Sequence, residues 1–156
     1  GIRDLTVTGV QKCALPILIA GDGIEKLKLK QLSEKLNIST KIKYFGFLKD
    51  IKSLLRLSNL YINTSYFEGF PNSVVEAINY EIPVICSQSH GGINEILLHG
   101  KCGTIFNNGN SFDLASKIEE YYNNPKKYFL KTKLAKKNIK RFTLRKNIMG
   151  YENLFN

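Results

Sequence analysis

Short apolar runs alternate along the chain with longer segments in which hydrophobic positions recur every three or four residues. The short runs predict buried strands, and the periodic segments predict amphipathic helices. Strands are expected at residues 18–20, 42–45, 60–64, 82–86 and 103–106. Helices are expected at residues 24–36, 51–57, 93–98 and 112–122, and from Pro71, Pro125 and Thr143 onward. Pro71 is expected at the first helical position, and Asp50 and Ser111 as helix caps.

Strands that alternate with helices of this length pair in parallel, because each helix carries the chain back across a face of the sheet. The predicted fold class is therefore α/β, with a doubly wound, Rossmann-like parallel sheet. Ligands of such sheets bind at the carboxyl ends of the strands. The loops that qualify are residues 21–23, 46–49, 65–72, 87–92 and 107–110.

The segment TSYFEGFPNSVVEA, residues 64–77, carries the clearest candidate chemistry. Glu68 and Gly69 lie in a strand-to-helix loop, and the free amides of Asn72 and Ser73 are expected to point into the crevice. Amides at a helix N-terminus bind phosphate well. Glu76 lies about one turn into the same helix, where a carboxylate can accept two hydrogen bonds from a vicinal diol such as a ribose.

This arrangement predicts a site for a nucleotide or a sugar phosphate. The alternative interpretation makes Glu76 a solvent-facing helix residue and Glu68 a loop charge. The residues alone leave both interpretations open.

The string EGFPNSVVEA resembles the C-terminal half of a family 4 (group 1) glycosyltransferase of the two-Rossmann-domain, GT-B type. IAGDG, YFGFLKD, the PVI of residues 83–85, GGINEI and CGTIF add to the resemblance, in the same order, from Leu18 to the C-terminus. The resemblance implies a retaining, metal-independent transfer of a hexose or N-acetylhexosamine. The donor is a UDP-sugar or, less favoured, a GDP-sugar, and the acceptor is a saccharide or a lipid-linked saccharide. Neither a cofactor nor a bound metal is expected.

The resemblance also implies roles for individual residues. Glu68 would contact hydroxyls of the donor sugar and support the reacting centre, and Glu76 would hold the ribose. Gly69 and Phe70 would meet the sugar through backbone groups, with Asn72 and Ser73 near the diphosphate. The base would pack against a loop of three residues, Gly46, Phe47 and Leu48.

Two departures from the family accompany these roles. The family normally has an Arg and a Lys that clamp the diphosphate, and both would lie upstream of Leu18. Glu81 stands where the family usually has Gly, at a position that suits a left-handed helix cap.

Residues 1–17, GIRDLTVTGVQKCALPI, resemble the translation of a short-read sequencing adapter. We therefore expect a non-native segment at 1–17, a Rossmann-like donor-binding domain at 18–124 and basic C-terminal helices at 125–156. On this interpretation the chain is a fragment without the acceptor domain and is inactive alone. A genuine N-terminal strand is the alternative.

Composition excludes several classes of protein. The 156 residues are 43% hydrophobic and 23% charged, which argues against a disordered or fibrous chain. No apolar run approaches the roughly 20 residues of a membrane span, and no secretory signal is evident, so a cytosolic protein is expected.

The net charge of +10 resides in one segment, because ten basic residues and no acidic residue lie between Lys126 and Lys146. Three explanations stay open. They are phosphate contacts of a nucleic-acid-binding module, attachment to an anionic membrane surface such as the inner face of the plasma membrane, and a solvated lysine face produced by an AT-rich genome. The glycosyltransferase interpretation expects no nucleic-acid partner. A UDP-sugar epimerase of the same fold is a further alternative.

Overall fold

The computed structural model describes residues 16–142. The chain divides into two compact units, Gly1–Leu54 and Leu55–Asn156, and each is described by itself. The helix predicted from Thr143 and most of the 1–17 segment lie outside the described residues. The predicted domain boundaries stay predictions.

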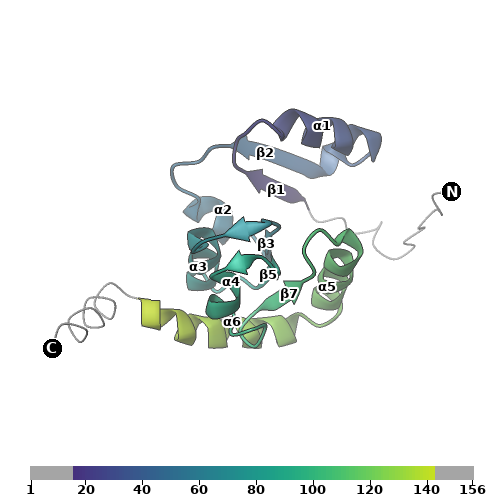
Figure 1. Cartoon of the computed structure of the whole chain (residues 1–156). Coiled ribbons are helices and arrows are strands. Elements are labelled where there is room, and N and C mark those ends of the chain that lie inside the picture. Colours follow the sequence, from purple (N-terminus) through teal and green to yellow (C-terminus); the bar gives the residue numbers. More distant parts are fainter. Residues whose placement is uncertain (1–15, 143–156) are drawn as a thin grey trace. The chain divides into compact units, whose positions relative to one another are not determined.

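The first unit contains a parallel pair of strands, β1 (Ile17–Ala20) and β2 (Ile42–Gly46), in which Ile17 lies opposite Ile42. They are connected by α1 (Lys26–Lys35) and the short 3-10 helix η2 (Ser39–Lys41). Figure 1 shows α1 beside the two strands. The helix α2 (Lys52–Arg56) follows, and the Asp50 carboxylate accepts the Lys52 amide at 2.9 Å. Asp50 thus accepts the first amide of α2 as expected, but it stands two residues before the helix rather than in the N-cap position.

The second unit is built on three parallel strands in the order β3 (Tyr61–Asn63), β5 (Val84–Ser87) and β7 (Thr104–Phe106). Its helices are α3 (Asn72–Asn79), α4 (Ile93–Ile96), α5 (Ser111–Asn123), α6 (Pro125–Asn138) and the 3-10 helix η3 (Ile139–Phe142). A further parallel pair, β4 (Phe67–Glu68) and β6 (His90–Gly91), lies in the loops and was not predicted. The parallel α/β, Rossmann-like fold class is confirmed.

The core of the second unit is centred on β5, in which Val84, Ile85 and Cys86 are all buried. A strand buried on both faces is the usual centre of a parallel sheet. Ile85 packs with Phe106 of β7 and Tyr128 of α6 in one cluster. The basic C-terminal helix α6 is therefore part of the core of this unit, next to α5 and α3 (Figure 1).

Two predicted helix starts were wrong. Pro71 precedes α3 as its N-cap, because its ψ of 86° is not helical. Asn110, rather than Ser111, caps α5: its backbone is extended, and its side-chain oxygen accepts the Asp113 amide at 3.0 Å. Ser111 is already the first helical residue, so its hydroxyl is not in the capping position.

Glu81 has the left-handed conformation that the sequence indicated, with φ of 61°. The Ile82 amide donates to Ala77 O at 3.0 Å and the Glu81 amide donates to Ile78 O at 2.9 Å, which together form a Schellman ending of α3. The carboxylate of Glu81 pairs with the Lys136 ammonium, and this hydrogen bond lowers the pKa of Glu81.

We predict that Glu81→Gly stabilises the chain, because glycine adopts a left-handed conformation without steric cost. A residue with a Cβ atom in that conformation lowers the free energy of unfolding by about 1 kcal/mol. Urea unfolding measures the effect. Glu81→Gln is the control, since it removes the ion pair but keeps the Cβ atom, and it is expected to leave the midpoint unchanged or slightly lower. If the glycine variant unfolds at a lower urea concentration than the glutamine variant, the claim that the backbone of Glu81 is strained is wrong.

Candidate functional site

Glu68 ends the short strand β4, in a loop at the carboxyl edge of the central sheet. Its side chain is half-buried, and its Oε1 accepts a hydrogen bond of 3.1 Å from the Asn63 side-chain amide. This bond uses one lone pair of the carboxylate. The other oxygen has no hydrogen-bond donor within residues 16–142, so it is available to a ligand.

Asn63 is a site residue that sequence reasoning missed. It is the last residue of β3 and is buried, and its Oδ1 accepts the Ser65 amide at 3.1 Å. Because that amide fixes the oxygen of the side chain, the Nδ2 donor necessarily faces Glu68. The available signal was a polar residue at the carboxyl end of an apolar strand, where ligands of this fold bind.

The backbone of Glu68 is held by an unusually close approach of β6. A Cβ atom on Gly91 would lie 1.8 Å from Glu68 O, and one on Gly92 would lie 2.7 Å from Gly69 O. The Gly92 amide instead donates to Gly69 O at 2.8 Å. Only glycine fits at position 91, so this residue allows the two backbone segments to approach. Gly69 itself faces open space, where a ligand can approach.

The N-terminus of α3 presents free donors beside this loop. The amides of Val74 and Val75 donate to Pro71 O, whereas those of Asn72 and Ser73 have no acceptor in the described part of the chain. Two unpaired amides at a helix start favour an anion.

The hydroxyl of Ser73 can also donate a hydrogen bond to a ligand. Tyr61 Oη donates to Ser73 Oγ at 2.9 Å, so the Ser73 proton remains for another acceptor. Burial raises the pKa of the Tyr61 hydroxyl, which keeps it in its donating form.

Glu76 and Phe70 complete the predicted set in this unit. Glu76 is exposed on α3, and its carboxylate has no ion pair within the described range. The Phe70 ring packs edge-on against Phe142 of η3, with centroids 5.2 Å apart. Phe70 nevertheless stays 43% exposed.

The second unit thus brings together six predicted residues: Glu68, Gly69, Phe70, Asn72, Ser73 and Glu76. The other three predicted residues lie in the first unit, with Gly46 ending β2 and Phe47 and Leu48 following it. There the Phe47 ring is 76% exposed, Leu48 is half-buried, and Gly46 O accepts the Gly21 amide at 2.7 Å.

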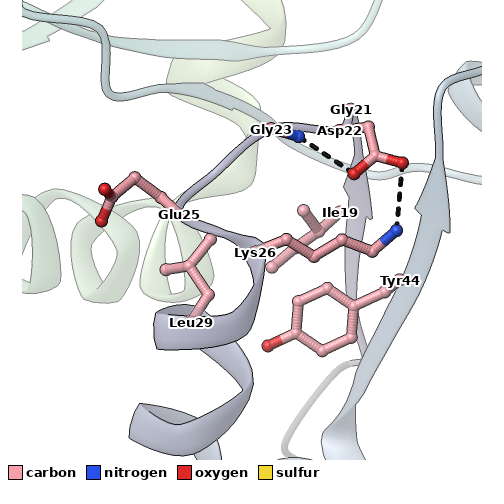
Figure 2. A pocket seen from close by; sticks show the side chains of 8 residues that line it. All are labelled: Ile19, Gly21, Asp22, Gly23, Glu25, Lys26, Leu29 and Tyr44. Carbon is pink, nitrogen blue, oxygen red and sulfur yellow. Dashed lines mark hydrogen bonds and ion pairs between the residues drawn. The ribbon is translucent and has the colours of Figure 1, made fainter.

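The first unit also contains a cavity of about 220 Å³ at the carboxyl end of β1 (Figure 2). Asp22 on its wall accepts hydrogen bonds from the Gly23 amide at 3.0 Å and from Lys26 Nζ at 3.1 Å, and the Lys26 bond is the main cause that lowers the pKa of Asp22. The wall is formed by Ile19, Gly21, Asp22, Gly23, Glu25, Lys26, Leu29 and Tyr44. None of the nine predicted binding residues lines it.

Within residues 16–142, no group of three His, Cys, Asp or Glu side chains is placed to hold a metal ion. None of the helices in this range is long and apolar enough to cross a membrane.

The parallel sheet and its helices define a Rossmann-like α/β protein of the kind found in GT-B glycosyltransferases. The chain matches the family of glycosyl transferases group 1 over residues 9–141. It belongs to this family. The match begins inside the 1–17 segment, whose resemblance to an adapter stays a prediction.

Individual relatives agree with this assignment. The chain is 38% identical over 81 residues to an uncharacterized glycosyltransferase, MJ1059, of Methanocaldococcus jannaschii, covering 52% of this chain and 20% of that protein. It is 33% identical over 88 residues to the amylovoran biosynthesis glycosyltransferase AmsD of Erwinia amylovora, covering 56% and 25%. Crystallised Anabaena HepE in complex with UDP superposes with a TM-score of 0.80 at 27% identity, covering 90% of this chain and 40% of HepE. The chain therefore spans well under half the length of these relatives.

We predict that Asn63→Ala destabilises the chain by about 1–3 kcal/mol, because the Ser65 amide and the Glu68 carboxylate both lose a partner beside a buried position. Urea unfolding measures this loss, and faster hydrogen exchange at the Ser65 amide would locate it. Asn79→Ala on the exposed side of α3 is the matched control and should stay within about 0.5 kcal/mol of the unchanged chain. Equal effects of the two substitutions would argue against the role of Asn63.

Proposed function

We propose that this chain is the donor-binding part of a retaining glycosyltransferase that takes a hexose or N-acetylhexosamine from a nucleotide sugar. UDP-sugar is the favoured donor, and a saccharide or lipid-linked saccharide is the acceptor. The observation that carries the proposal is the pair Glu68 and Glu76 on either side of two free helix amides, in a chain that belongs to the group 1 family.

The leaving group is the first requirement of the reaction. When the bond between the anomeric carbon and the diphosphate breaks, negative charge collects on the diphosphate oxygens. The amides of Asn72 and Ser73 and the dipole of α3 are suited to stabilise this charge, because they are fixed before the reaction begins. The Ser73 hydroxyl accepts from Tyr61 and keeps its own O–H, which adds a third hydrogen-bond donor.

The sugar is the second requirement, because positive charge develops at its ring as the leaving group departs. A carboxylate near the ring tolerates that charge. Glu68 has one oxygen fixed by Asn63 and the other free, so in this proposal it contacts the donor sugar in a defined orientation. The open space at Gly69 leaves room for the sugar next to the backbone.

The nucleoside is assigned to the remaining residues. Glu76 is exposed and unpaired, as a carboxylate that accepts both ribose hydroxyls needs to be. The exposed Phe47 ring offers a flat apolar surface to a base, with Gly46 and Leu48 beside it in the sequence. The proposal assigns no step to a metal ion or cofactor.

The choice of donor and acceptor class draws on the relatives. Anabaena HepE, at 27% identity, has been crystallised with UDP and with UDP-glucose, which favours a UDP-sugar over a GDP-sugar. AmsD is named for amylovoran biosynthesis, which supports a saccharide acceptor. Membership of the group 1 glycosyltransferase family supports a sugar-transfer site over the epimerase and nucleic-acid alternatives.

Glu76→Ala is predicted to weaken UDP binding about 10- to 100-fold, the equivalent of one or two charge-assisted hydrogen bonds. Isothermal titration calorimetry measures the affinity. The matched control is Glu119→Ala, which removes an exposed carboxylate from α5 and should leave UDP affinity unchanged. Unaltered UDP affinity in the Glu76 variant would refute the ribose assignment.

Glu68→Gln is predicted to act on the sugar alone. UDP should bind the variant within about twofold of the unchanged chain, whereas UDP-glucose should lose about tenfold, because one charge-assisted hydrogen bond to the sugar is weakened. Titrations with the two ligands, run in parallel, separate these effects. An equal loss for both ligands would place Glu68 at the nucleotide instead.

A further inference from the structure

The helix α6 has one side buried and one side outward, although lysine occurs on both. Tyr128, Thr132 and Ala135 recur at intervals of four and three residues and are all buried. The opposite side, here called the outer face of α6, carries two leucines and a phenylalanine among lysines. Its members are Lys126, Phe129, Leu130, Lys133, Leu134 and Lys137.

The apolar residues of the outer face are uncovered. Leu130 is 63% exposed and Leu134 is 52% exposed, and Phe129 lies at the edge of the same face with its ring 45% exposed. Leu130 and Leu134 are one turn apart and therefore adjacent on the helix surface. The outer face therefore presents two adjacent exposed leucines on one side of its lysines and Phe129 on the other, and the described chain does not cover these apolar side chains.

Lys140 of η3 is exposed and has no ion pair within residues 16–142, and the other cations of α6 and η3 fall into two groups. The cations that face the protein have partners. Lys127 pairs with Glu120, Lys136 with Glu81 and Arg141 with Glu95. Lys131 donates hydrogen bonds to the carbonyl oxygens of Gly100 and Gly103 at 2.9 and 3.0 Å. The three lysines of the outer face, Lys126, Lys133 and Lys137, have no ion pair within residues 16–142. Acidic residues thus pair with three of the four inner cations and with none of the lysines of the outer face.

The lysines and the exposed apolar side chains together distinguish a nucleic acid from an anionic bilayer as the partner of this face. A nucleic acid would use the lysines through its phosphates but gain little from exposed leucines. It would also favour arginine for bidentate phosphate contacts, and the outer face has none. An anionic bilayer uses both features, because lysines reach the lipid phosphates while leucine and phenylalanine enter the boundary between headgroups and acyl chains.

We propose that the outer face of α6 docks this chain on an anionic lipid bilayer. The 14-residue helix lies parallel to the membrane surface, with Leu130 and Leu134 at the headgroup boundary and the three lysines among the lipid phosphates. Because η3 continues from α6 and Phe142 packs on Phe70, the docking face and the candidate site loop belong to one packed unit.

The test is sedimentation of the chain with vesicles of phosphatidylglycerol and phosphatidylcholine, compared with vesicles of phosphatidylcholine alone. Binding to the mixed vesicles only is expected, and it should fall as salt is raised. The triple variant Lys126→Gln, Lys133→Gln, Lys137→Gln should bind at least about tenfold more weakly, since each lysine near an anionic surface contributes several-fold in affinity. Lys35→Gln, Lys43→Gln, Lys52→Gln is the control with the same net charge and should bind almost as the unchanged chain.

The double variant Leu130→Ser, Leu134→Ser keeps every charge and isolates the apolar contact. It should also lose several-fold in vesicle binding, while circular dichroism shows an unchanged fold because both side chains are exposed. Unaltered vesicle binding of this variant would overturn the proposal, and so would an equal loss for the control lysine variant. Tighter binding to a DNA duplex than to vesicles would assign the face to nucleic acid. None of these outcomes bears on UDP affinity, so the donor-site proposal is tested separately.

Discussion

The arrangement of the candidate site depends on one close contact between two backbone segments. Gly91 and Gly92 approach the carbonyl groups of Glu68 and Gly69 so closely that a side chain at position 91 has no space. This contact makes the two-residue ladder between β4 and β6 possible and fixes the backbone of the loop. Asn63 then fixes the side chain of Glu68, and the same loop leads into α3 with its two free amides. A carboxylate and two free helix amides are thereby held a few residues apart in one loop.

The features predicted correctly from the sequence are local. Alternating apolar runs and periodic segments were enough to predict parallel strands and the α/β class, because burial patterns follow from spacing along the chain. The left-handed conformation of Glu81 was indicated by the family resemblance, because the family usually has glycine at this position. The string from Glu68 to Glu76 could be predicted to enter a helix at the carboxyl edge of the sheet. Whether these residues bind a donor stays a proposal.

The features that sequence reasoning missed depend on contacts between distant segments. The ladder of β4 and β6 pairs residues more than twenty positions apart in two-residue strands, which are too short to produce an alternating pattern. Asn63 looked like an ordinary strand end, and only the fold shows that its amide faces Glu68. The cap of α5 shifted from Ser111 to Asn110 because both residue types cap helices, and backbone geometry decides between them. The sequence places the net charge in one segment. Only the fold shows which cations of that segment have partners and which lysines are unpaired on the outer face of α6.

The central claim is that the start of α3 binds the diphosphate of a nucleotide sugar. Backbone amide shifts in a ¹⁵N–¹H NMR titration of the chain test it most directly, with UDP compared against uridine, which has no phosphate. The account predicts that the amides of Asn72 and Ser73 shift strongly downfield with UDP and little with uridine, because they donate to phosphate oxygens. Equal shifts with both ligands, or UDP shifts confined to other parts of the chain, would contradict it.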